Sequence, residues 1–426
     1  MSGLVLWGSF LSLVLARVPI VYAMGIAGGL TLMLDGLPLT LLIQRMMAQI
    51  DSFALLAVPF FILTGSVMEA GGISARLVRL ASALVGRFRG GLGAVCITST
   101  TVFSGISGSS AADASAIGSV LLPAMIRRGY SRAYAAALQA AAAVNGPIIP
   151  PSVLMIVYAS IANVSVGAMF VGGAVPGAIV AIALIAGNWW WARKNGDLIE
   201  PPPAKGEIAE AFYDAIWALI VPVIILGGIL AGVFTATEAG VVAVVYSFVV
   251  SIFVYRELKL RDVQKVVLAA VVTTAQVMII VAAAAIFGWL LAAQGFPAMA
   301  ADALTSLTSS PTIAILLVIV VLLIIGCVME ILAAAIVLVP VLSPIAEHYG
   351  FHEVHFAVVM VIAMAIGSIT PPVGVTLYIC LGIAKTTIAE VNRYIWYFVA
   401  IILVALLIVT FVPETVLWLP RVFSLI

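Results

Sequence analysis

A proline-containing break in an apolar stretch occurs twice in this chain, at a constant separation. Gly-Pro-Ile-Ile-Pro-Pro occupies Gly146–Pro151, and Gly-Ser-Ile-Thr-Pro-Pro occupies Gly367–Pro372, 221 residues later (367 − 146). Gly105 and Gly326 keep the same offset. The chain therefore reads as two copies of one unit, each with a long apolar helix that glycine and proline interrupt. Paired interruptions in the two halves of an apolar chain indicate the binding site of a transporter.

The composition restricts the chain to one structural class. Of its 426 residues, 64% are hydrophobic and 9% are charged, which predicts an all-α polytopic membrane protein. The net charge of +1, with no basic arm, gives no indication of nucleic-acid binding. Cys96, Cys327 and Cys380 all lie in apolar segments, so they predict neither a disulfide framework nor a metal cluster. The first apolar run lacks a basic region before it, and we read it as a first helix and not a cleaved signal.

Charges separate the apolar stretches and define the expected spans. The linker is expected at residues 193–212, which contain three consecutive prolines, and it divides the chain into repeats at 1–192 and 213–426. The spans are expected at 4–16, 18–34, 53–70, 132–165, 171–191, 213–233, 238–255, 272–292, 354–384 and 391–412.

Two further apolar stretches predict re-entrant hairpins. Residues 91–126 carry the polar run Ser104–Ser110 in their middle, and each flank is shorter than the about 20 residues that a spanning helix needs. By the repeat offset, residues 312–346 form the partner hairpin, centred on Gly326. Non-helical backbone at that depth is tolerated where it is buried in protein or faces a wet cavity.

The positions of the basic residues predict that the two repeats are inverted. With both hairpins re-entrant, the first repeat crosses the membrane an odd number of times. If the linker is cytoplasmic, only Arg45 and Arg421 of the 19 lysines and arginines lie outside, as the positive-inside rule requires. Leu39–Asp51 and Leu260–Ala270 read either as amphipathic helices along opposite membrane surfaces or as ordinary loop helices.

Four polar breaks are expected to meet near the centre of the bilayer: the hairpin tips at 104–110 and 326–330, and the helix breaks at 145–152 and 367–374. Broken helices expose unpaired carbonyl groups, which suit Na⁺, and unpaired N–H groups, which suit a carboxylate. The alternative is that these breaks only shape the helices. We assign one cation site to Ser104, Ser107, Asn145 and Gly146, and a second to Gly326, Gly367 and Thr370.

The remaining polar groups at the breaks are assigned to the substrate. These residues are Ser109, Ser110, Asp113, Ser152, Pro150 and Pro371. Asp113 has two further interpretations, as a partner of a coupling ion or as a first-turn carboxylate that the helix dipole favours, and Glu330 has the same two. Glu238 follows Thr235 at the start of a helix and is interpreted as a structural cap.

Two other kinds of site are weighed against transport. His348, His352 and His355 have helical spacing and are candidates for a metal site, although a solvated loop is the simpler interpretation. Gly105–Gly108 fits the Gly-x-Ser-Gly pattern of intramembrane serine proteases, but that chemistry needs a histidine base near Ser107. We therefore expect no enzymatic activity, and no organic cofactor.

The residues resemble the large membrane subunit of the tripartite ATP-independent periplasmic (TRAP) transporters. The matching stretches are Gly71–Ile73, Arg89–Gly91, Ser104–Asp113, Pro123–Tyr130, Asn145–Ser152, Val164–Gly167, Pro176–Gly177, Thr237–Ala239 and Gly367–Gly374. They cover most of the chain in the expected order.

This resemblance implies a multi-pass bacterial inner-membrane protein with the elevator fold of the ion-transporter superfamily. It implies Na⁺-driven import of a small organic acid, such as a C4-dicarboxylate or sialic acid, with the cation sites at the hairpin tips and helix breaks. It also implies two partners, a small four-helix membrane subunit and a soluble periplasmic binding protein. No small subunit is fused here, so we expect a separate polypeptide. A stand-alone Na⁺/dicarboxylate symporter and a channel are the alternatives within transport.

Overall fold

Helices make up the chain in the computed structural model, which describes residues 2–195, 204 and 206–426. Part of the expected linker, residues 196–203 and 205, lies outside the described residues. In chain order the helices are α1 (Ser2–Leu15), α2 (Ile20–Leu34), α3 (Thr40–Ile50), η1 (Phe53–Leu56), α4 (Ala57–Ala70), α5 (Ile73–Val85), α6 (Gly91–Ser107), α7 (Ser110–Arg127), α8 (Arg132–Ala142), η2 (Ala143–Asn145), α9 (Val153–Ala162), α10 (Val166–Asn195), α11 (Glu207–Leu230), α12 (Ala236–Val249), η3 (Val250–Val254), α13 (Leu260–Ala293), α14 (Phe296–Leu307), α15 (Pro311–Val328), α16 (Ile331–His348), α17 (Glu353–Gly367), α18 (Val375–Ala384), α19 (Ile388–Phe411) and α20 (Glu414–Val422).

The fold is that of a polytopic membrane protein. Among the described residues, eight helices are long and apolar enough to cross a membrane: 53–70, α10, α11, 236–254, α13, α15, α16 and α19. Large apolar side chains remain exposed along their outer faces, as expected for helices in contact with lipid. The all-helical prediction is confirmed.

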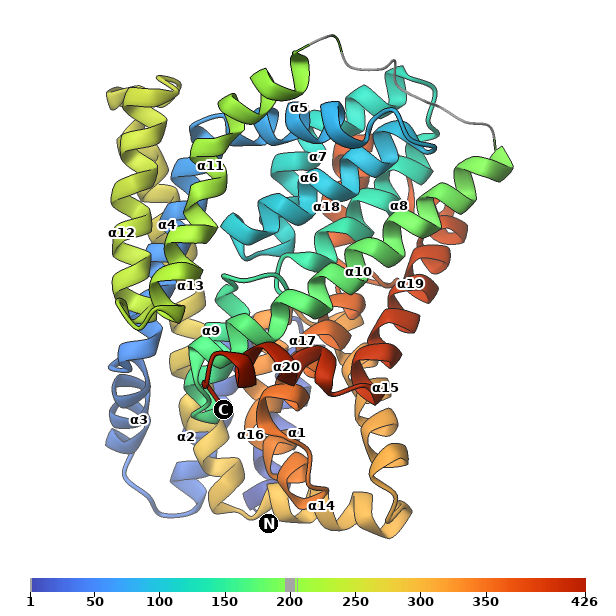
Figure 1. The fold of residues 1–426 in the computed structure, drawn as a ribbon. Helices are drawn as coiled ribbons and strands as arrows, with labels where there is room; N and C mark the ends of the chain where they lie inside the picture. Colours follow the sequence, from blue (N-terminus) through green and yellow to red (C-terminus); the bar gives the residue numbers. More distant parts are fainter. Residues whose placement is uncertain (1, 196–203, 205) are drawn as a thin grey trace.

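Two helical hairpins keep the register of the sequence repeat. Helix α6 ends at Ser107 and α7 begins at Ser110, and α15 ends at Val328 and α16 begins at Ile331, each boundary 221 residues after its counterpart. Figure 1 shows α6 and α7 in the upper part of the molecule, near the grey segment, and α15 and α16 in its lower part. Their connecting tips point toward the middle.

Gly326 does not form the tip of the second hairpin, where the sequence analysis centred it. It lies inside α15, and the chain turns three residues later at Met329 and Glu330, both in extended conformation. The glycine is required for close packing instead, because a Cβ atom at Gly326 would lie 3.0 Å from the carbonyl oxygen of Met364 and 3.1 Å from the Cα of Gly367.

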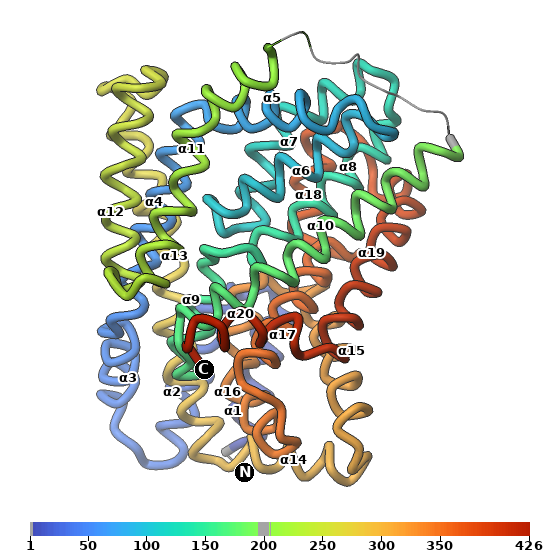
Figure 2. Tube along the Cα trace, viewed as in Figure 1, coloured from blue at the N-terminus to red at the C-terminus, as the bar shows by residue number. Residues whose placement is uncertain are grey.

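Both predicted helix breaks are present. In the first half, α8 and the short η2 are separated from α9 by the non-helical residues 146–152. In the second half, residues 368–374 separate α17 from α18. Figure 2 shows α9 and α17 approaching the centre of the molecule, where the two hairpin tips also lie.

The expected surface helix at Leu260–Ala270 is wrong. These residues form the first third of α13, which continues without a break to Ala293. The stretch between 260 and 287 contains no glycine or proline, so nothing in the sequence ends the helix. The corresponding α3 is a separate helix, and α3 and α4 both pack against α13.

Two arginines of α5, Arg76 and Arg79, form ion pairs with the second half of the chain, and Arg76 is the more buried of the two. The Arg76 guanidinium lies 3.1 Å from the carboxylate of Asp214 on α11 and 2.8 Å from that of Glu257, and it stacks over the ring of Tyr255 at 3.9 Å. It also donates hydrogen bonds to the carbonyl groups at the α4–α5 turn, where Gly72 has a positive φ of 75°. This contact connects α5, the approach to the first hairpin, with α11.

Candidate functional site

A cavity of about 530 Å³ lies where the hairpin tips and the helix breaks meet. One wall comes from α4 and α13, and the other walls come from both hairpin tips and from the residues around both helix breaks. The lining consists of Ile62, Gly65, Ser66, Glu69, Phe103, Ser107–Ala112, Ser115, Pro147, Val153, Leu154, Thr273, Val277, Met329–Leu332, Ser368, Val375, Thr376 and Ile379. Its volume is typical of a site for a small molecule.

The N-termini of four helices face this cavity: α7, α9, α16 and α18. The Ser152 side chain caps α9 and the Glu330 carboxylate caps α16, each by accepting a backbone N–H. In the described part of the chain, no side chain caps α7 or α18. Near the start of α18, the Thr376 N–H donates to the carbonyl of Ser368 at 3.1 Å. The positive dipole ends, and the uncapped N-terminus of α7 in particular, favour an anion in the cavity.

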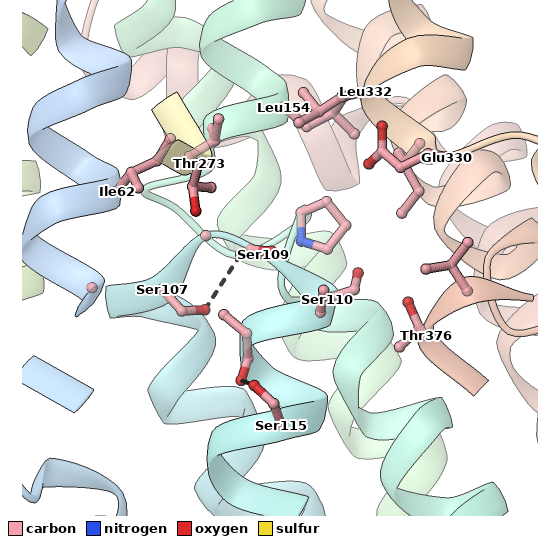
Figure 3. Close-up of a pocket in the computed structure, with 18 of the residues that line it drawn as sticks. Ile62, Ser107, Ser109, Ser110, Ser115, Leu154, Thr273, Glu330, Leu332 and Thr376 are labelled. Atoms are coloured by element: carbon pink, nitrogen blue, oxygen red, sulfur yellow. Dashed lines mark hydrogen bonds between the residues drawn. The ribbon is translucent and has the colours of Figure 1, made fainter. Parts of the chain in front are cut away.

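The cavity lining is largely apolar, and the polar side chains within it carry no positive charge. Among the residues that the structure describes, no lysine or arginine lines it, and the two charged side chains are Glu69 and Glu330. The Ser110 hydroxyl lies in the lining, is buried, and has no hydrogen-bond partner among the described residues. Figure 3 shows Glu330, Ser110 and Thr376 around the same space, with Ser109 beside Ser110 and Thr273 on the opposite side.

Beside the cavity, the first predicted cation site forms a compact, buried cluster. The Ser104 hydroxyl lies 2.5 Å from the Asp113 carboxylate, and the Ser107 hydroxyl donates to its other oxygen. The side-chain oxygen of Asn145 is buried without a hydrogen-bond partner in the described chain, while its amide nitrogen donates to Thr101 at 3.1 Å. Hydroxyl and carboxylate oxygens at the first hairpin, together with an unpaired amide oxygen on the adjoining η2, are the kinds of ligand that a hard cation requires.

Gly146 brings this cluster together. A Cβ atom there would lie 2.6 Å from the backbone of Ser109 and Ser110 and 2.8 Å from the Asp113 carboxylate. Only glycine allows the broken helix to approach the first hairpin tip this closely.

The residues of the second predicted cation site also lie together. A Cβ atom at Gly367 would lie 2.6 Å from Gly326, so α15 and α17 touch through their glycines. The Thr370 hydroxyl donates to the carbonyl of Ile366 at 2.8 Å, and the Gly374 N–H donates across to the carbonyl of Cys327 at 3.3 Å. This site offers mainly carbonyl and hydroxyl oxygens and no carboxylate.

The residues assigned to the substrate divide into two groups. Ser109 and Ser110 line the cavity, whereas Ser152, Pro150 and Pro371 lie behind its surface. Asp113 is fully buried and faces the hydroxyl groups of the first cation cluster.

Sequence reasoning missed several polar residues of the lining. Glu69, Ser66 and Ser115 come from helix interiors, and Thr273 and Thr376 come from the second half. A carboxylate within the apolar span 53–70 was the one signal that pointed to Glu69. Buried behind the cavity, the Gln139 amide on α8 donates to Thr100 and to the Asp113 carbonyl, and nothing in the sequence indicated this contact.

The alternative sites from the sequence have other roles. The histidines do not share one helix, because α16 ends at His348 and His352 caps α17, and the ring of His355 contacts the carbonyl of Val409 at 3.0 Å. Glu238 forms a capping box with Thr235, which confirms its structural interpretation.

Comparison with known proteins decides the family. The family model described as "Tripartite ATP-independent periplasmic transporter, DctM component" matches residues 7–415. The chain belongs to this family. It is therefore a transporter permease subunit, and it is placed in the bacterial inner membrane.

Two curated relatives support this assignment, and one solved structure has a similar fold. The chain is 40% identical to an isethionate TRAP transporter permease protein of Oleidesulfovibrio alaskensis over 96% of its own length, and it spans 65% of the length of that relative. It is 34% identical to a C4-dicarboxylate TRAP transporter large permease protein of Rhodobacter capsulatus, with both chains fully covered. The fold is similar to that of the Alcanivorax borkumensis YdaH transporter, with a TM-score of 0.63 at 15% identity, covering 91% of this chain and 90% of that one.

Proposed function

We propose that this permease imports a small organic acid together with Na⁺. The observation that carries the proposal is the convergence of four helix N-termini on one cavity, next to a buried cluster of oxygen ligands. The N-termini would receive the acid group, and the clusters around Asn145 and Gly367 would receive the cations.

The chemistry of the first cluster supports Na⁺ as the coupling ion. Its groups are hydroxyl, amide and carboxylate oxygens, and no sulfur or imidazole group takes part in the contacts described there. The unpaired oxygen of Asn145 would gain a partner when a cation binds, so binding would remove the cost of a buried, unsatisfied acceptor. A cation held beside the cavity would also attract the acid of the substrate.

The membrane potential would then drive uptake. Inward movement of one uncompensated positive charge is favoured by about 2.3 kcal/mol per 100 mV. Two or more cations for each monovalent acid would therefore give net uphill transport.

An elevator movement is supported by how the cavity is built. Its walls come from α4 and α13 on one side and from the hairpins and broken helices on the other. If the hairpins and broken helices move as a unit against α4 and α13, the bound acid and cations cross the membrane together. The repeats are expected to be inverted, so that the two hairpins alternate as the covers of the site.

Two partners are expected to act with this chain, a small four-helix membrane subunit and a periplasmic binding protein that delivers the acid. One relative is named for isethionate, a sulfonate, and another for C4-dicarboxylates. An acid group also suits the N-termini of α7 and α18, which no side chain caps in the described part of the chain. We infer an acid as the substrate class on both grounds.

The deciding experiment is uptake into proteoliposomes. The permease is reconstituted with its small subunit, the binding protein is added outside, and uptake of a labelled organic acid is measured in a Na⁺ gradient and after replacement of Na⁺ by K⁺. We expect uptake only with Na⁺ and only with all three proteins. Undiminished uptake in K⁺ would reject Na⁺ coupling, and Na⁺-dependent uptake by the permease alone would instead support a stand-alone symporter.

A further inference from the structure

The charges in the cavity are unusual for a site that takes an acid. Both charged groups in its lining, Glu69 and Glu330, are carboxylates, and among the described residues neither forms a salt bridge. They come from separate elements, α4 and the tip of the second hairpin. A simple dicarboxylate in this space would add two negative charges to those of the two glutamates, and like charges repel.

The lining also contains an uncapped helix N-terminus, which suits an acid group. The N-terminus of α7, an 18-residue helix, has no side-chain cap. There the Ser110 hydroxyl is only 5% exposed and has no hydrogen-bond partner among the described residues. An unpaired buried hydroxyl in the wall of a cavity indicates that the partner is a ligand.

We propose that the substrate is zwitterionic: an organic acid that also carries an ammonium group, with its acid at the α7 N-terminus and its ammonium group at the carboxylates of Glu69 and Glu330. This inference rests on the proposed function, because it concerns the same cavity, and it narrows the substrate class.

Charge balance favours this assignment over a hydroxylated acid. A hydroxyl group can donate to a carboxylate, but it leaves the negative charges of both glutamates in place. An ammonium group donates up to three hydrogen bonds and neutralises one of those charges. Hydrogen bonds between charged partners are also roughly twice as strong as neutral ones.

Glu330 lines the cavity and also caps a helix. Its Oε2 atom accepts the N–H of Ala333 at 3.0 Å as the cap of α16. Figure 3 shows the Glu330 side chain on the side of the cavity where Ser110 and Thr376 lie. Glu69, Glu330 and Ser110 line one cavity of about 530 Å³, so the acid and ammonium groups of one small molecule would occupy the same space.

Matched pairs of small acids test this directly. Taurine and isethionate differ only in an ammonium group against a hydroxyl group on the same sulfonate, and β-alanine and 3-hydroxypropionate do so on a carboxylate. Binding is measured by calorimetry on the full-length permease with its small subunit in lipid nanodiscs containing NaCl. We expect the ammonium member of at least one pair to bind about tenfold more tightly than its hydroxyl partner, because its contacts to the carboxylates are charge-assisted.

Two variants test whether the carboxylates cause the preference for the ammonium compound over its hydroxyl partner. Glu69→Gln and Glu330→Gln are each expected to reduce the ratio of affinities within the pair to less than about threefold, and the second keeps an amide oxygen that can cap α16. Glu238→Gln, in the capping box of α12 away from the cavity, is the control and should leave the ratio unchanged.

Three results would overturn the inference: failure of both ammonium compounds to bind, equal or inverted affinities in both pairs, or a preference that survives both glutamine variants. The proposed function fails separately. If the hydroxyl members bind equally well and all binding requires Na⁺, the importer stands and the zwitterionic substrate does not.

Discussion

The substitution Gly146→Ala tests how the first cation cluster is assembled. Gly146 has ordinary helical angles, φ −50° and ψ −54°, so alanine is compatible with its backbone conformation. The space is not available, however, because the new Cβ would lie 2.6 Å from the backbone of Ser109 and Ser110 and 2.8 Å from the Asp113 carboxylate. Any effect of the substitution therefore arises from this contact.

The size of the effect follows from the overlap. Ordinary contacts of a Cβ begin at 3.4 Å, so the tip backbone must retreat by about 0.8 Å (3.4 − 2.6) and the carboxylate by about 0.6 Å (3.4 − 2.8). Overpacking of this kind typically costs about 1–3 kcal/mol. If this displacement of the tip backbone and the carboxylate separates the cation ligands, the same free energy is lost from Na⁺ binding. The Na⁺ affinity then falls by about 5- to 150-fold.

The assay is a Na⁺ titration. The midpoint of Na⁺-dependent thermal stabilisation of the purified permease, and that of Na⁺-dependent uptake, should both move to about 5- to 150-fold higher Na⁺. Gly382→Ala is the matched control: it lies in helix α18, where a Cβ atom meets nothing within 4 Å. We expect it to leave both midpoints unchanged and to stabilise the fold slightly, by about 0.5–1 kcal/mol. Wild-type Na⁺ midpoints in Gly146→Ala, or the same shift in the control, would refute the reasoning.

Three further substitutions test other contacts. Gly367→Ala places a Cβ 2.6 Å from Gly326, so we expect a loss of thermal stability of about 1–3 kcal/mol and weaker Na⁺ dependence; an unchanged melting temperature would show that α15 and α17 are not in contact. Gln139→Leu removes the amide that donates to the Asp113 carbonyl and should cost about 1–3 kcal/mol in unfolding free energy, measured by chemical denaturation. Arg76→Ala should slow uptake and lower thermal stability, because it releases α5 from α11, whereas Arg79→Ala, whose guanidinium is half exposed, should change stability by less than about 1 kcal/mol. Equal effects of the two arginine substitutions would contradict the role assigned to Arg76.

Much of the fold could be predicted from the sequence because its breaks are local. The non-helical stretches before α9 and α18 follow from glycine and proline residues, whose effect on a helix does not depend on neighbours. The ends of α15 and α16 at the second hairpin also lie 221 residues after those of α6 and α7. Gly326 shows where this approach fails, because a glycine can serve a turn or a close contact, and only the position of α17 distinguishes them.

The candidate site could be predicted only in part, for the same reason. Ser104, Ser107 and Asn145 lie at breaks that the sequence marks, and the structure places them in one cluster. Glu69 and Thr273 lie in continuous helices, and they reach the cavity only because α4 and α13 pack around it. Tertiary contacts of this kind leave no pattern in a single sequence.

The two halves are duplicated in sequence but unequal in mechanics. Helix α13 runs for 34 uninterrupted residues, a stiff strut of about 51 Å. Its counterpart beside it, α3 followed by η1 and α4, has a joint at residues 51–56. A force on α13 is carried along one continuous helix, whereas a force on its counterpart can bend it at residues 51–56. The α13 side of the cavity wall is therefore stiffer than the α4 side.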